Sequence, residues 1–304
     1  MRAMSEQSID HRAVVMALSP TDREQLIARA DGPALFRFAI HFGVVLVVAA
    51  LVLAKIPYWP LLMLPLGILM IFLFTALHET IHETAFRSLF LNRIVANICG
   101  FLVIVPPVWF RYFHFAHHGH THDPVNDPEL SSAKPLTFWQ YVAHLSSIPY
   151  WIIMVKTIAA NVIGPNREAF VAERARVKVV NEARLFVGLY GALFLASLIA
   201  GSALLLWVWI IPILLGQPFL RAYLLAEHAR CPHVANMLEN TRTTFTNAVV
   251  RFIAWNMPFH AEHHALPTVP FHQLPRFHEI VREHLKTTER GYARFHRNFV
   301  RDLG

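Results

Sequence analysis

The chain has 304 residues, enough for one large or two ordinary soluble domains, but 55% of them are hydrophobic and only 15% are charged. This apolar content exceeds what a soluble core uses and predicts an integral membrane protein. The net charge of +7 would suit nucleic acid, yet the basic residues flank apolar segments, so we expect a membrane surface and no nucleic-acid partner. Two cysteines provide no disulfide framework.

The N-terminal quarter predicts a polar segment followed by a transmembrane hairpin. Residues 1–34 are polar and mixed in charge, show no secretory leader pattern, and are expected to be cytosolic. Residues 35–54 form the first apolar run long enough to cross a hydrocarbon core of about 30 Å. A turn at 55–60 carries Tyr and Trp at headgroup depth, and residues 61–77 return directly to a histidine. Residues 35–77 are therefore the first predicted hairpin.

Residues 78–184 are mixed in character and are expected to lie in the cytosol or at the membrane interface. The apolar run at 94–110 is short and broken by a glycine and two prolines, so it should dip into the membrane or lie on it. Residues 136–160 are rich in aromatic side chains with polar interruptions, which predicts one interfacial amphipathic helix. Residues 166–184 are charged and expected to be cytosolic.

A second hairpin is predicted for residues 185–226. This apolar run is too long for one spanning helix, and Gly201-Ser202 near its middle marks a minimal turn. Arg221, near the end of the run, is expected to extend toward the cytosolic interface. Residues 227–304 are polar and basic. The predicted fold class is therefore all-α integral membrane, with four transmembrane helices in two hairpins, interfacial helices and a histidine-rich cytosolic cap.

The distribution of Lys and Arg predicts the orientation. Residues 1–37 hold five of them, 79–184 hold ten and 221–304 hold eleven, whereas the opposite-side turns hold only Lys55. By the positive-inside rule, both termini and the central segment are cytoplasmic, in what is most simply a bacterial inner membrane.

Eight of the 19 histidines lie in three short boxes between the apolar segments. Within each box the spacing of three or four residues brings the imidazoles onto one helical face. Eight imidazoles are too many for one zinc ion, so two metal ions are the natural number. Imidazole suits Fe, Zn, Cu and Ni, so the ligand type alone does not identify the metal. An acyl chain buried in a membrane offers unactivated C–H bonds, and attack on such a bond needs O2 at a redox metal, which favours iron. The boxes are His78 and His82; His114, His117 and His118; and His260, His263 and His264.

Other functions and other histidines were weighed against this interpretation. His78-Glu79-Thr80-Ile81-His82 also satisfies H-E-x-x-H, the zinc protease pattern with Glu79 as general base, but that leaves two boxes unexplained. A non-enzymatic metal carrier would not need repeated helical spacing. His41, inside the first span, is either a functional group or an interfacial residue. His120 and His122 are off the box spacing and not expected to be ligands. Seven more are expected at the surface: His11, His144, His233, His272, His278, His284 and His296.

The boxes carry a resemblance to a known family. H-E-T-I-H at 78–82, H-F-A-H-H at 114–118 and H-A-E-H-H at 260–264 resemble the three histidine boxes of the membrane fatty acid desaturase family, which includes hydroxylases and carotenoid ketolases. Box order, the four spans and the intervening distances all match, so the resemblance covers most of the chain. N-M-P-F-H-A-E-H-H is similar to many bacterial members.

The resemblance implies a cytosolic di-iron centre with the eight box histidines and His228, after the fourth span, as ligands. Some desaturases place an Asn one turn before that histidine, and this chain has Leu224 at that position. The difference leaves open whether the site desaturates or hydroxylates its substrate. Asp127 resembles an acidic position that orients a ligand histidine. Asn256, Glu79 and Glu262 also lie close to ligands in sequence. Each of these four residues either supports the ligand histidines or serves in a turn, a helix cap or plain solvation.

The implied activity is O2-dependent removal of hydrogen from an unactivated C–H bond, by default in a lipid acyl chain. Loss of a second hydrogen gives an alkene, whereas oxygen rebound gives an alcohol. Desaturation is the favoured reaction, and the alternative is a hydroxylase or ketolase that acts on an acyl or another substrate. No fused electron-transfer domain is evident, so two electrons would come from a separate ferredoxin or a cytochrome b5-type carrier with its reductase.

Overall fold

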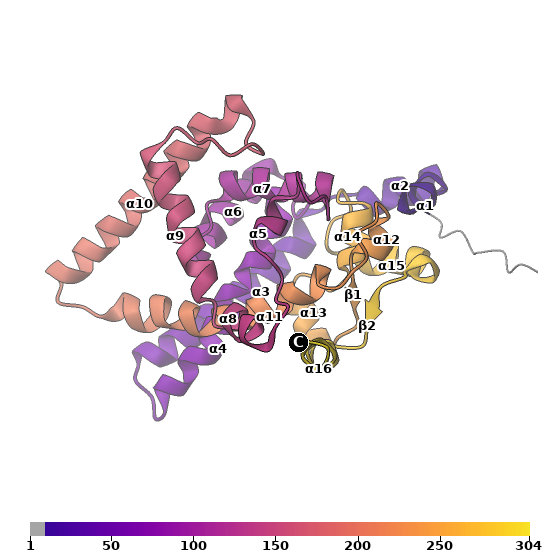
Figure 1. Ribbon diagram of the computed structural model, residues 1–304. Helices are drawn as coiled ribbons and strands as arrows, with labels where there is room; N and C mark the ends of the chain where they lie inside the picture. The colour runs from indigo at the N-terminus through magenta and orange to yellow at the C-terminus, as the bar shows by residue number, and fades with distance from the viewer. Residues whose placement is uncertain (1–9) are drawn as a thin grey trace, which may run out of the picture.

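The computed structural model describes residues 10–304, so the first nine residues of the predicted N-terminal segment lie outside the described part (Figure 1). Four helical stretches are long and apolar enough to cross a membrane. They are α3 (Asp31–Leu53), α4 (Trp59–Ile71) with α5 (Leu73–Ile81), α10 (Arg176–Ile199), and the π-helical turn η3 (Leu206–Ile210) with α11 (Ile211–His228). At 1.5 Å per residue, α3 is about 34 Å long, enough for the hydrocarbon core.

Two regions are bent pairs of helices. The run at 94–110, which was predicted to be broken at its prolines, belongs to α6 (Leu89–Val103) and α7 (Pro107–His120), which meet at 96°. The prediction of a single interfacial helix at 136–160 is wrong, because α8 (Phe138–Leu145) and α9 (Ile148–Ile163) meet at 56°. If each bent pair crosses the membrane, the spans number six instead of four. Prolines explain both breaks: Pro106-Pro107 and Pro149 each stand at the start of the second helix, where a missing N–H costs nothing.

The remaining elements are short. Before the first span are α1 (His11–Met16) and α2 (Pro20–Ile27); between the spans are the 3-10 turns η1 (Pro128–Ser131) and η2 (Glu173–Ala175). The C-terminal region contains α12 (Met237–Asn240), β1 (Thr243–Thr244), α13 (Ala248–Ile253), α14 (His260–Ala265), α15 (Leu274–Val281), η4 (Arg282–His284), β2 (Thr288–Glu289) and α16 (Tyr292–Arg301). The two strands are parallel, with Thr243 opposite Thr288.

The C-terminal region forms a cap at one end of the helical bundle. Figure 1 shows α12, α14 and α15 grouped beside α1 and α2, while α9 and α10 stand on the other side of the bundle. Buried Arg242 joins the cap to α11, because its guanidinium donates to the carbonyls of Ala226 and Ala229. Arg230 donates to the carbonyl of Phe299 in α16 at 2.9 Å. The cap is therefore attached to the end of α11.

Glycines let two membrane helices approach at backbone contact. A Cβ atom added at Gly67 in α4 would lie 1.9 Å from the carbonyl oxygen of Pro212, and one added at Gly216 in α11 would lie 2.2 Å from the carbonyl oxygen of Gly67. Small residues at such crossings allow close packing where no hydrophobic force acts between helices. This contact fixes α11, which ends at His228, against α4, which leads into the first histidine box.

Polar contacts reinforce the bundle inside the apolar region. His41 in α3 is buried, and its Nε2 lies 2.9 Å from the carbonyl oxygen of Leu69 in α4. Thr75 in α5 donates to the carbonyl of Ile253 at 3.0 Å, and Arg37 donates to that of Arg251 at 3.1 Å. His41 therefore joins two spans, which accounts for an ionisable group at that depth, and the other two contacts hold α13 against the bundle.

We expect Gly216→Ala to lower the stability of the detergent-solubilised protein by about 1–3 kcal/mol or more, because the new methyl group meets backbone atoms that cannot rotate away. Gly43→Ala is the control, since a Cβ atom there meets nothing within 4 Å. Thermal unfolding followed by intrinsic fluorescence measures both. Equal melting temperatures for the two variants would contradict the close contact.

Candidate metal centre

The histidine boxes lie at helix ends that converge from distant parts of the chain. His78 is in the last turn of α5 and His82 caps that helix, while the second box occupies the C-terminal half of α7. The third box is α14 itself, and His228 is the last residue of α11. Seven of these nine histidines are buried, and His82 and His118 are half-buried. The fold thus brings together all nine histidines that the sequence singled out.

Two groups of ring nitrogens form within this set. In each group, one nitrogen from every histidine lies within 4.8 Å of the others, which would allow one metal ion to bind them together. His260 adjoins the second group, with its Nε2 3.1 Å from Nε2 of His228. The two groups adjoin where the rings of His118 and His264 stack, with their centres 4.1 Å apart and their planes at 23°. The first group is His78, His82, His114, His118 and His263; the second is His117, His228 and His264.

The distances between facing nitrogens fit metal coordination. Nε2 of His78 lies 3.0 Å from Nε2 of His263, and Nε2 of His117 lies 3.1 Å from Nε2 of His228. A neutral imidazole has one bare nitrogen, which is the atom that binds a metal. With metal–nitrogen bonds of about 2.1 Å, two ligands at a right angle are about 3.0 Å apart. The histidine clusters could therefore bind metal, and their all-imidazole donor set fits an iron centre.

Burial keeps the imidazoles of the third box uncharged. Desolvation, followed by the charge on His117, lowers the pKa of His263 to about 3. Burial and the neighbouring histidines lower the pKa values of His260 and His264 well below 6.5. At neutral pH these rings are therefore unprotonated at one nitrogen, the form that a metal ion requires.

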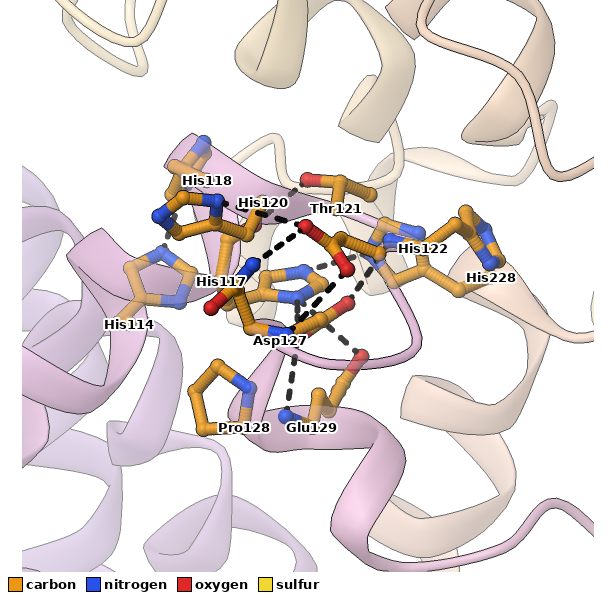
Figure 2. Close-up of polar contacts among 12 residues, drawn as sticks. His114, His117, His118, His120, Thr121, His122, Asp127, Pro128, Glu129 and His228 are labelled. Carbon is orange, nitrogen blue, oxygen red and sulfur yellow. Dashed lines mark hydrogen bonds and ion pairs between the residues drawn. The ribbon is translucent and has the colours of Figure 1, made fainter. Parts of the chain in front are cut away.

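Asp127 holds His117 from behind, as Figure 2 shows. Nδ1 of His117 donates to Oδ1 of Asp127 at 2.9 Å, which directs Nε2 toward the other histidines. The carboxylate also accepts the backbone N–H groups of His122 and Glu129, each at 2.9 Å. Asp127 is buried, so these hydrogen bonds fix the loop after α7 and the orientation of one ring together.

Two carboxylates near the histidines were missed in the sequence analysis. Oε1 of Glu227 lies 3.5 Å from Nδ1 of His260, and Oε2 of Glu129 lies 3.7 Å from Nδ1 of His117. Burial raises the pKa of Glu129, but Lys134 and His117 together lower it further, to about 2, so this group is ionised. The position of Glu227 directly before His228 was the only signal for it in the sequence.

Glu79 and Asn256 support the chain around the third box. Oε1 of Glu79 lies 3.9 Å from Nδ1 of His263, while its Oε2 accepts the N–H of Phe271 at 3.1 Å. The side chain of Asn256 donates to the carbonyl of Phe271 at 2.9 Å. Phe271 is thus held on both sides, and the segment after α14 is fixed across the end of α5.

Glu262 was considered as a support for the ligand histidines, but its contacts are with other residues. Its two oxygens lie 2.5 Å from Nδ1 of His278 and 2.5 Å from Oγ1 of Thr243, so it ties α14 to α15 and β1. His278 is buried in this contact, and the prediction that it lies at the surface is wrong. His11 was also wrongly assigned to the surface, because it is buried and its Nδ1 accepts the N–H of Met237.

Two more histidines that were expected at the surface, His144 and His296, are half-buried. Nε2 of His144 lies 3.4 Å from the carbonyl oxygen of Arg221, and Nε2 of His296 lies 3.1 Å from that of Ala222, so both contact α11. His122 is buried beside the second group, and its Nε2 lies 2.8 Å from the carbonyl oxygen of Asn240.

A cavity of about 210 Å³ adjoins the histidines. Five of them face it: His78, His114, His117, His228 and His260. Its apolar wall includes Phe74, Trp109, Phe110, Phe113, Met154 and Leu224. Arg221 also lines it, with the guanidinium 4.3 Å from the ring centre of Tyr150. A small, largely apolar chamber therefore opens directly onto the metal-binding nitrogens.

Comparison with known proteins agrees with this geometry. The family model for fatty acid desaturases matches residues 53–296, which include all three boxes and His228. No curated protein gives a significant match. The family implies an oxidoreductase, and its apolar helices make this a membrane protein. With the family model matching most of its length, the chain belongs to the membrane fatty acid desaturase family.

Proposed function

We propose that the protein is a di-iron oxidoreductase that removes hydrogen from an unactivated C–H bond with O2 and two electrons. His78, His82, His114, His118 and His263 would hold one iron, and His117, His228, His260 and His264 the other. When bound, the iron pair supplies the oxidising power that no side chain of the protein has. The observation that carries this proposal is that two groups of imidazole nitrogens lie together and adjoin one largely apolar cavity.

In this proposal the protein's own residues orient the ligand histidines and shield the reacting carbon from water. Asp127 accepts from Nδ1 of His117, so this ring presents Nε2 to the centre. Glu227 and Glu79 lie 3.5 Å and 3.9 Å from Nδ1 of His260 and His263, beyond the distance of a good hydrogen bond. Aromatic side chains such as Phe110 and Trp109 line the cavity and exclude water from the reacting carbon. The cavity walls would hold the target carbon beside the histidines, which is the positioning that sets the site of attack.

We expect alkene formation as the main reaction, with the family as support. Hydroxylation is the second candidate, and the observation that favours it is Leu224, an apolar side chain in the cavity wall one turn before His228. Some desaturases have an Asn one turn before the corresponding histidine. Product analysis with reduced ferredoxin, its reductase and O2 separates an alkene from an alcohol.

The same proposal covers topology and electron supply. Both termini and the metal centre would face the cytoplasm, because that side carries 26 of the 27 Lys and Arg residues. A separate ferredoxin or cytochrome b5-type carrier would bind this basic face. The H-E-x-x-H protease is not favoured, because Glu79 is buried and accepts the N–H of Phe271, which leaves it poorly placed to activate a water molecule.

We expect two iron ions per chain in the purified protein and a loss of about one in His263→Ala, because that ring has four neighbours in the first group. His120→Ala is the control: it is exposed on the same helix as the second box. Elemental analysis counts the metals. One zinc per chain, unchanged in the His263 variant, would refute the di-iron proposal.

We further expect Asp127→Asn to weaken metal binding about 10- to 100-fold, because the amide no longer accepts strongly from Nδ1 of His117. Competition with a chelator measures the affinity. Asp123→Asn, in the same loop but half-buried and without a short contact to a box histidine, should behave like the unmodified protein. Equal metal retention by both variants would show that Asp127 only shapes the loop.

A further inference from the structure

The N-terminus of α7, the helix that carries the second histidine box, has no cap of its own. The helix begins at Pro107, which has no N–H, and its N-cap is Pro106, whose side chain cannot accept a hydrogen bond. Phe110 donates its N–H to the carbonyl of Pro106 at 2.9 Å. The N–H groups of Val108 and Trp109 are therefore left without a partner inside the helix, and leaving such groups unpaired is costly.

Glu182 of α10 supplies the missing cap from a distant part of the chain. Both of its carboxylate oxygens accept the N–H of Val108 at 2.9 Å, and Oε2 also accepts the N–H of Trp109 at 3.2 Å. These N–H groups are the ones that an N-cap side chain normally serves, and a carboxylate suits the positive end of the helix dipole. The buried residues of α10 all lie within 179–186, so this otherwise exposed helix meets the bundle around Glu182 (Figure 1).

A second carboxylate fixes the side chain of Trp109. Its indole Nε1 donates to Oε2 of Glu168 at 2.7 Å, and the same oxygen accepts from the side chain of Asn166 at 2.7 Å. The indole ring stacks on Phe113, with the ring centres 5.2 Å apart. Trp109 is thus held by its backbone through Glu182 and by its ring through Glu168.

The residues held in this way face the cavity beside the histidines. Trp109 and Phe113 belong to its apolar wall, and His114 and His117, further along the same helix, face the same space. His114 follows Trp109 by five residues, about 7.5 Å along the helix axis. A shift of α7 would therefore move the wall and the ligand rings together, and a misplacement of about 1 Å can lower a rate about 100-fold.

We propose that Glu182 is a positioning residue: by tying α7 to α10, it sets the place of the second box at the metal centre and, with Glu168, the place of Trp109 in the cavity wall. The inference rests on the proposed function, because it assigns these contacts to the placement of the carbon that reacts. Glu182 acts through α7 and does not itself bind the metal. It also gives α10 a part in the chemistry of a site that lies on other helices.

Cobalt substitution tests this positioning without any substrate. Co2+ bound to imidazole absorbs visible light in bands that depend on the arrangement of its ligands, and competition with a chelator measures its affinity. We expect Glu182→Gln to shift these bands and to lower Co2+ affinity about tenfold, because an amide cannot accept N–H groups at both of its terminal atoms. Arg184→Gln is the matched control, since this exposed side chain of α10 donates to the carbonyl of Val162 in α9. Bands and affinity equal to those of the unmodified protein in Glu182→Gln would overturn the proposal.

A double variant separates positioning from mere capping. Pro106→Asp, added to Glu182→Gln, gives α7 an N-cap side chain of its own that can accept the same N–H groups. We expect this pair to regain the melting temperature of the unmodified protein and to keep the altered Co2+ bands, because its cap no longer ties α7 to α10. If the bands are regained as well, Glu182 only caps the helix and the positioning role is wrong. The pair also serves if Glu182→Gln alone does not fold.

The position of attack tests the cavity wall. Iron-loaded protein in nanodiscs of stearoyl-oleoyl phosphatidylcholine receives reduced ferredoxin and O2, and mass spectrometry locates the new double bond or hydroxyl group. Trp109→Phe keeps an aromatic ring but loses the hydrogen bond to Glu168, so we expect at least about twofold more product at neighbouring carbons with unchanged metal content. An unchanged product distribution would refute the role of the wall. No product from the unmodified protein would count against the proposed function, and the cobalt measurements would still decide the role of Glu182.

Discussion

The constraint on which the structure depends is that nine histidine rings lie together inside an apolar protein with their nitrogens facing one another. Facing Nε2 atoms about 3 Å apart, as in His78 and His263, cannot all share hydrogens, and burial disfavours charging them. A metal ion on each group would satisfy these atoms at once. The helices then follow from this requirement, because α5, α7, α11 and α14 must all end at the same place.

Rigid contacts elsewhere keep those helix ends in position. The glycine crossing of α4 and α11 places His228 relative to His78, and Arg242 fixes the cap that carries α14. Behind the rings, Asp127 directs Nδ1 of His117, and Glu262 anchors α14 through His278. The membrane helices, the cap and the carboxylates thus together position the histidines, and the cavity beside them leaves room for a substrate.

The sequence predicted what depends on local periodicity and not what depends on tertiary contacts. Histidines three and four residues apart, and apolar runs of spanning length, are visible without a fold. Glu129 and Glu227 were missed because their partners are brought near only by folding, and His278 was misplaced because its partner Glu262 lies on another helix. The bends at 96° and 56° were missed because prolines mark a break but not its angle.

The most direct test of the central claim is Mössbauer spectroscopy on reduced protein loaded with iron-57, which resolves iron ions in different surroundings. The account predicts two quadrupole doublets of equal area, because the two groups of imidazole nitrogens differ in the number of histidines that they offer. A single doublet from one iron per chain would contradict it.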